Sequence, residues 1–135
     1  MAKRGKVIRQ AAVMAVREGR VCLITSSSGK RWLVPKGNLL SDGRLRKAAI
    51  QEAWEEAGLV GTLRAKPVGS YHLEKLGKLY EVVVFRMNVA QVKRDWPERK
   101  RRKRRWFRPE KAVSLIAHAR LKKLIGAAFG RGRAA

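Results

Sequence analysis

Cysteine is almost absent from this chain of 135 residues. The single Cys22 excludes an intrachain disulfide and a metal site built from several cysteines. Because Cys22 lies in the apolar run of residues 21–24, we expect a small buried side chain rather than a reactive thiol. No apolar run approaches ~18 residues, which excludes a membrane-spanning helix. The basic first residues are followed by no apolar signal-peptide core, so we expect a cytoplasmic protein.

Negative charge is the second shortage. Ten Asp and Glu residues stand against 33 Lys and Arg, which gives a formal net charge of +23. A field of that strength attracts polyanions, which include nucleic acid, an anionic membrane surface and small polyphosphates. Charge alone does not choose among these three. Hydrophobic residues make up 45% of the chain, which excludes a disordered protein. We expect one domain over residues 1–135, with loose tails at 1–8 and 130–135.

The order of apolar stretches and turn residues predicts an α/β protein, with helices around a mixed β-sheet. Extended segments are predicted at residues 10–16, 21–25, 32–34, 63–71 and 79–89, with a further short strand ending at Trp106-Phe107. Helices are predicted at residues 45–57, 109–118 and 121–129, and a loop at residues 36–43.

The helix predicted at residues 45–57 ends at Gly58, a residue suited to the left-handed conformation that follows many helices. At 100° per residue, Ile50, Ala53, Trp54 and Ala57 share one face. We expect that apolar face, with the Trp54 indole, to be buried against the sheet.

Three glutamates, Glu52, Glu55 and Glu56, project from the same helix at spacings of i, i+3 and i+4. Like charges at these spacings repel one another by a few tenths of a kcal/mol, so they gain nothing from proximity. A solvated acidic face is the ordinary explanation of such a pattern. Here, however, three of only ten acidic residues crowd one helical turn beside a glycine-containing loop. A divalent cation would convert the repulsion into coordination, since Mg²⁺ prefers oxygen ligands.

The stretch from residue 37 to residue 59 resembles the Nudix box of the Nudix hydrolase family. That box reads Gly, five residues, Glu, seven residues, then Arg-Glu-apolar-x-Glu-Glu-x-Gly-apolar. The chain keeps the spacing and the Glu-x-x-Glu-Glu-x-Gly end, but Gly43 replaces the first Glu and Gln51 replaces the Arg. In the family these two side chains are near enough to pair, so losing both leaves no orphaned charge. We interpret the departure as a changed loop in an active enzyme.

The resemblance implies a Nudix-like α/β/α sandwich that hydrolyses phosphoanhydride bonds with Mg²⁺ or Mn²⁺. The implied metal ligands are the backbone carbonyl of Gly37 and the carboxylates of Glu52, Glu55 and Glu56, which are also the catalytic residues. Glu52 is the candidate for orienting or deprotonating the attacking water. In this family the base can lie outside the box, where Glu98 is the best candidate and Glu74 and Glu81 are weaker ones.

Further segments resemble the diphosphoinositol polyphosphate phosphohydrolases, a branch that also hydrolyses diadenosine polyphosphates. The segments are residues 9–12 (RQAA), 23–28 (LITSSS), 31–37 (RWLVPKG), 95–96 (DW) and 105–107 (RWF). The branch implies a basic pocket for a polyphosphorylated small molecule. By position, the substrate-binding residues would be Arg9, Ser26, Ser27, Lys30, Arg31 and Lys36. His72 and His118 are lone histidines, for which we expect structural roles.

Seven consecutive cations, Arg99 to Arg105, lie between Trp96 and Trp106. The run fits attraction of a polyphosphate, and with its aromatic neighbours it equally fits contact with single-stranded RNA. Two alternatives to a small-molecule hydrolase therefore stay open: removal of pyrophosphate from an RNA 5′ end, and a non-catalytic RNA- or ribosome-binding protein on a Nudix scaffold. The three retained glutamates favour an enzyme, because an acidic cluster hinders the binding of a phosphate chain unless a cation is bound. Both a monomer and a homodimer are compatible with the sequence.

Overall fold

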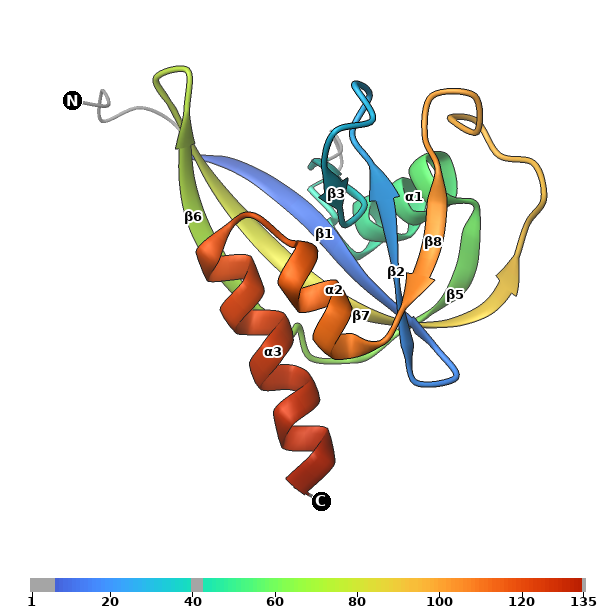
Figure 1. Ribbon diagram of the computed structural model, residues 1–135. Coiled ribbons are helices and arrows are strands. Elements are labelled where there is room, and N and C mark those ends of the chain that lie inside the picture. Colours follow the sequence, from blue (N-terminus) through green and yellow to red (C-terminus); the bar gives the residue numbers. More distant parts are fainter. Residues whose placement is uncertain (1–6, 40–42, 135) are drawn as a thin grey trace.

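The computed structural model describes residues 7–39 and 43–134 and places a β-sheet between helices (Figure 1). The elements in chain order are β1 (Ile8–Arg17), β2 (Arg20–Thr25), β3 (Trp32–Leu33), β4 (Lys36–Asn38), α1 (Leu45–Ala57), β5 (Leu59–Leu63), β6 (Gly69–Lys75), β7 (Lys78–Val92), β8 (Arg104–Phe107), α2 (Pro109–Leu115) and α3 (Ala119–Ala134).

The sheet is mixed, as the sequence predicted. Its main path runs β3-β2-β1-β7-β5, with β4 paired to β1, β6 to β7 and β8 to β2. Strands β1 and β7 pair in parallel at the centre, while the other pairs are antiparallel. The turn between β1 and β2 is made by Glu18 and Gly19, both at positive φ, which is typical of a tight hairpin.

Each face of the sheet has its own apolar core. Strand residues such as Ala11, Val13 and Phe85 pack with α1 on one face, while their neighbours Ala12, Met14 and Val84 pack with α2 and α3 on the other. This alternation follows from the two-residue period of a strand. Figure 1 shows α2 and α3 together on one side of the sheet and α1 behind it. The expected α/β/α arrangement is confirmed.

Helix α1 has the predicted bounds, and Gly58 follows it at φ +67° as expected. The prediction of its buried face was wrong in part. Ala53 and Ala57 are buried, but Ile50 and Trp54 are 45% and 37% exposed. The helix is rotated by roughly a quarter of a turn from the expected orientation, so that its alanines face the sheet. Small side chains allow a close approach, and this rotation turns Glu56 inward.

Other boundaries differ from the predictions for local reasons. The loop expected at residues 36–43 begins with strand β4, because Lys36–Asn38 pairs with β1; residues 40–42 lie outside the described part of the chain. The single strand expected at residues 63–71 is two strands separated by a loop that contains Pro67. Helix α2 ends at Leu115, three residues earlier than expected.

Both predicted tails were too long. Strand β1 already includes Ile8, which pairs with Tyr80. Helix α3 continues through Ala134, so residues 130–134 are helical and only residue 135 of that tail lies outside the described range. At the other end, residues 1–6 are also outside that range.

The orientation of α1 is testable by a pair of substitutions. Ala53→Leu places three extra carbon atoms between α1 and the sheet, so we expect it to lower the free energy of unfolding by about 1–3 kcal/mol. Trp54→Ala removes a larger but partly exposed side chain and should cost about 1 kcal/mol or less. Urea titration followed by circular dichroism measures both. A larger loss for Trp54→Ala than for Ala53→Leu would contradict the observed orientation.

Candidate metal centre and phosphate-binding pocket

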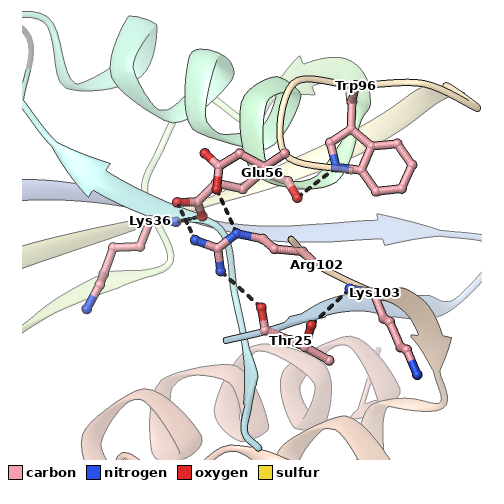
Figure 2. Close-up of polar contacts among 7 residues, drawn as sticks. Thr25, Lys36, Glu56, Trp96, Arg102 and Lys103 are labelled. Atoms are coloured by element: carbon pink, nitrogen blue, oxygen red, sulfur yellow. Dashed lines mark hydrogen bonds and ion pairs between the residues drawn. The ribbon is translucent and has the colours of Figure 1, made fainter. Parts of the chain in front are cut away.

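Glu56 joins three parts of the chain that are distant in sequence (Figure 2). Its residue exposure is only 9%. The backbone N–H of Lys36 in β4 donates to Glu56 Oε1 at 3.0 Å, and Nη2 of Arg102 lies 3.5 Å from Oε2. Burial raises the pKa of Glu56, and these two donors partly offset that rise. A buried carboxylate with an N–H and a guanidinium beside it is stable in the ionised form only because of such partners.

Glu52 lies against the backbone of Gly37. A Cβ atom placed on Gly37 would come within 2.2 Å of Glu52 Cδ, so only glycine leaves room for this carboxylate. Glu52 also shares a hydrogen bond with Glu56. Burial, followed by the charges of Glu56, Glu55 and Glu98, raises the pKa of Glu52 to about 7. The other carboxylates therefore create a negative electrostatic potential around Glu52, which a bound cation would offset.

Glu55, the third glutamate, contacts Gln51, the residue that replaces the arginine of the Nudix box. The amide Nε2 of Gln51 donates to Glu55 Oε1 at 2.7 Å. Within residues 7–39 and 43–134, no three acidic, histidine or cysteine side chains already stand in the arrangement of a bound metal ion. Binding of a divalent cation by all three glutamates therefore requires at least one of their side chains to move.

The donor set nevertheless fits Mg²⁺ or Mn²⁺. Its groups are carboxylate oxygens and the main chain of Gly37, and hard cations prefer oxygen ligands. The close approach of the Glu52 carboxylate to the Gly37 backbone and the mutual repulsion of the glutamates both favour a cation at this place.

The loop between β7 and β8 closes the carbonyl end of α1. The last carbonyls of a helix have no partner within the helix. Here Glu55 O accepts the N–H of Glu98 at 3.0 Å, Glu56 O accepts Trp96 Nε1 at 3.1 Å, and Ala57 O accepts Arg104 Nη1 at 2.7 Å. The Arg104 guanidinium also lies 4.2 Å from the centre of the Trp96 ring. The loop is thereby fixed against the helix that carries the glutamates.

This closure brings Glu98 and Arg102 to the glutamates. Nε of Arg102 donates to Glu98 Oε1 at 2.9 Å, and Nη1 donates to Thr25 O at 3.0 Å. The side chains of Arg102 and Glu98 are 15% and 21% exposed, so the ion pair is largely shielded from water. Glu98 was the sequence-based candidate for a base outside the box, and the structure places it in this network.

The basic run of residues 99–105 is divided by the fold. Arg102 and Arg104 turn inward, whereas the exposed members are Arg99, Lys100, Arg101, Lys103 and Arg105. The two flanking tryptophans are engaged within the protein: Trp96 contacts Glu56 and Arg104, and Trp106 packs on the core beneath α1. Neither indole is free to serve as a stacking platform in this conformation.

The six predicted substrate-binding residues are not all in one place. Lys36 is beside Glu56 through its backbone, and Figure 2 shows its side chain directed away from that carboxylate. Arg9 pairs with Glu81 at 2.9 Å. Ser26 is buried and organises its loop, since its Oγ accepts the N–H of Arg31 at 3.2 Å. The remaining predicted side chains are exposed on that loop: Ser27, Lys30 and Arg31.

A pocket of about 500 Å³ contains cations that the sequence did not single out. It is lined by Lys75 from β6 and by His118 and Arg120 at the junction of α2 and α3, together with His72, Leu73, Glu74 and Leu79. Burial, and then the charge of Lys36, lowers the pKa of His118. Burial, and then the charge of Lys75, lowers the pKa of Lys36. These groups therefore influence one another electrostatically. Lys36 is not among the described residues that line this pocket, and it contacts Glu56 through its backbone N–H. No local motif marks Lys75 or Arg120, because only folding brings them together.

Two expectations about reactivity and location can be assessed. Cys22 is fully buried, and burial raises the pKa of its thiol to about 12, so the prediction of an unreactive cysteine is confirmed. In the described part of the chain, no helix is long and apolar enough to cross a membrane. The cytoplasmic location stays a prediction.

Comparison with known proteins supports the same fold. The family model described as the NUDIX domain matches residues 7–127. Nudix hydrolase 12, mitochondrial, from Arabidopsis thaliana is 32% identical over 111 residues, covering 76% of this chain and 55% of that protein. Diphosphoinositol polyphosphate phosphohydrolase 3-beta from Bos taurus is 31% identical over 103 residues, covering 74% of this chain and 62% of that protein. The chain thus spans less than two thirds of the length of these relatives.

Solved structures share the architecture at low sequence identity. A NUDIX hydrolase from Nitrosomonas europaea superposes with a TM-score of 0.78 at 16% identity, over 93% of this chain and 90% of that one. A C. elegans Ap4A hydrolase binary complex gives a TM-score of 0.71 at 22% identity, over 93% of this chain and 99% of that one. These likenesses establish the fold.

The raised pKa of Glu52 predicts a pH dependence of stability in the metal-free protein. Between about pH 4.5 and pH 7 the folded protein keeps a proton that the unfolded chain has lost, so stability falls as pH rises through this window. We expect wild type to lose roughly 1 kcal/mol or more between these limits relative to Glu52→Gln, which lacks the titrating group. Denaturant unfolding in EDTA at several pH values measures the difference. If the free energies of unfolding of wild type and Glu52→Gln change with pH in the same way, the environment described for Glu52 is contradicted. Glu18→Gln is the control.

Proposed function

The chain belongs to the NUDIX family, and on that premise we propose that it is a metal-dependent hydrolase of phosphoanhydride bonds in densely phosphorylated small molecules. The observation that carries the proposal is the group of facing carboxylates at the end of α1. Glu52 and Glu56 share a hydrogen bond beside Gly37, and Glu98 is brought to them by Arg102. A protein that only bound phosphate chains would gain nothing from such a concentration of negative charge.

Mg²⁺ or Mn²⁺ is the proposed cofactor, held by the carboxylates of Glu52, Glu55 and Glu56 and by the carbonyl oxygen of Gly37. When bound, such an ion neutralises charge on the phosphoanhydride oxygens and lowers the pKa of a coordinated water. Lys36 and Arg102 each contact one carboxylate oxygen of Glu56. These two contacts fix the orientation of an otherwise flexible side chain.

Two carboxylates are candidates for accepting the proton of the attacking water. Glu52 lies beside the other carboxylates of α1, and burial together with their charges raises its pKa in the metal-free protein. Glu98 is held at 2.9 Å by Arg102, which fixes its orientation. We assign the role to Glu52 first, since it lies on α1 beside the other proposed ligands.

A small molecule with several phosphate groups is the proposed substrate, with inositol pyrophosphates and diadenosine polyphosphates as the two classes. The supporting observation is the open pocket of about 500 Å³ with Lys75, His118 and Arg120, whose Lys75 and His118 interact electrostatically with Lys36. Cations gathered at such a hollow suit a compact polyanion. Relatives named for diphosphoinositol polyphosphates and a structural neighbour named for Ap4A agree with this choice.

RNA is the second candidate substrate. Five exposed cations of the run at residues 99–105 favour contact with a phosphate backbone. Against it, Trp96 and Trp106 are occupied within the protein, so the aromatic part of a single-strand site is missing there. If RNA binds at these exposed cations, the protein either removes pyrophosphate from an RNA 5′ end or binds RNA without catalysis.

The metal centre is tested by release of phosphate and nucleotide in the presence of Mg²⁺. The substrates should include an inositol pyrophosphate, diadenosine hexaphosphate, nucleoside triphosphates and triphosphorylated RNA. Glu55→Gln and Glu56→Gln each remove one ligand charge with little change of shape, and we expect turnover to fall by about a hundredfold or more. Glu18→Gln, on the exposed β1–β2 turn, should retain full activity. Near-normal turnover in both helix variants would exclude the proposed centre.

The substrate class is tested by two double variants of equal charge. Lys75→Ser with Arg120→Ser alters the pocket, and Lys100→Ser with Arg101→Ser alters the exposed run. We expect the pocket variant to lower kcat/KM for diadenosine hexaphosphate by about tenfold or more, because direct ionic contacts to phosphate are lost. The run variant should change kcat/KM for that substrate by less than about threefold, as expected of screened surface charge. The reverse pattern, with a preference for triphosphorylated RNA that disappears in the run variant, would favour the RNA candidate.

A further inference from the structure

A second basic cavity lies on the opposite face of the sheet from α1. It has a volume of about 600 Å³ and is lined by Met14, Arg64, Lys66, Pro67, Val68, Arg86 and Ala128. Met14 belongs to the core beneath α2 and α3, whereas the glutamate helix packs on the other core. The cavity therefore shares no lining residue with the metal centre or with the pocket that contains Lys75.

Two arginines of this cavity lie side by side in the fold. Arg64 directly follows β5, and its backbone N–H donates to the carbonyl of Arg86 in β7 at 2.9 Å. Lys66 comes two residues later, in the loop that leads to β6. Three cations are thus gathered at one cavity, and no acidic residue is among those that line it.

Arg86 is the least solvated of the three. Its Nε atom is buried and has no hydrogen-bond partner within the described part of the chain. Burial lowers the pKa of the guanidinium, and the charge of Arg64 lowers it further. The guanidinium carbon lies 5.8 Å from the centre of the Phe129 ring in α3, an arrangement that orients the group and supplies no negative charge. A partly desolvated guanidinium beside another cation is unfavourable unless an anion completes the site.

We propose that this cavity binds the phosphate groups of a small multiply charged anion, at a site separate from the metal centre. A phosphate offers several acceptor oxygens to the guanidinium groups of Arg86 and Arg64 and to the ammonium group of Lys66, and arginine matches such oxygens in a bidentate manner. The concave shape suits a compact ligand, whereas a nucleic-acid strand needs an extended groove. This site goes beyond the proposed hydrolysis, since an anion could occupy it while the glutamates and their pocket remain accessible.

General attraction to a chain of net charge +23 is the competing explanation, and a matched variant separates the two. Arg86→Gln removes the oriented guanidinium, and Arg94→Gln makes the same change at an exposed position after β7. Unspecific attraction would weaken equally in both variants and would be screened by salt.

Sodium tripolyphosphate is the probe, titrated in EDTA at physiological salt and followed by the amide NMR shifts of the whole chain. In wild type and Arg94→Gln we expect saturable shifts at the amides of residues 64–66, 68 and 86. In Arg86→Gln the affinity measured at these amides should fall by about tenfold or more, and in Arg86→Lys, which keeps the charge but loses the planar fork, by a smaller factor. Arg86→Lys provides the test if Arg86→Gln does not fold.

Four results would overturn the proposal. One is tripolyphosphate shifts that never reach the amides of residues 64–66 and 68, and another is equal weakening in Arg86→Gln and Arg94→Gln. The third is that single-stranded RNA without a terminal phosphate shifts these amides while tripolyphosphate does not shift them. Hydrolytic turnover with Mg²⁺ should be unchanged in Arg86→Gln, so the outcome is independent of the proposed function. Loss of turnover with intact tripolyphosphate binding would likewise contradict the separation of the two sites.

Discussion

The buried carboxylate of Glu56 is the interaction on which the functional half of this protein depends. One of its oxygens accepts the backbone N–H of Lys36 and the other faces Arg102, while the carbonyl of the same residue accepts the indole N–H of Trp96. Strand β4, helix α1 and the β7–β8 loop therefore meet at a single residue. Removing either donor to the carboxylate would leave a nearly buried charge only partly compensated, which is costly in a protein interior.

This constraint explains why a chain so rich in cations can form an acidic centre. The loop that follows β7 satisfies the last carbonyls of α1, and in doing so it delivers Glu98 as well as Arg102 to the glutamates. One arginine reduces the repulsion among several carboxylates but does not remove it, as the raised pKa of Glu52 indicates. The remaining negative potential favours a divalent cation, and the pocket cations Lys75 and Arg120 agree with the proposed phosphate-rich substrate.

Local chemistry determined what could be predicted from the sequence. The bounds of α1, its end at Gly58 and the grouping of its glutamates follow from periodicity and from the conformational freedom of glycine, so they were foreseen correctly. The buried face of α1 was not, because burial of Glu56 instead of Trp54 depends on Arg102, which is 46 residues away along the chain. The pocket residues Lys75 and Arg120 were missed for the same reason: strand pairing and helix docking bring them together, and no local pattern records this. Gln51 was recognised as a departure, but its hydrogen bond to Glu55 became visible only in three dimensions.

The central claim is that the glutamates of α1 and the carbonyl of Gly37 form the metal centre of this protein. A crystal grown with Mn²⁺ tests it most directly, because anomalous scattering locates the ion without reference to activity. The account predicts an anomalous peak within coordination distance of Glu52, Glu56 and the Gly37 carbonyl oxygen. An anomalous map with no peak at these residues, at Mn²⁺ concentrations that support full turnover, would contradict it.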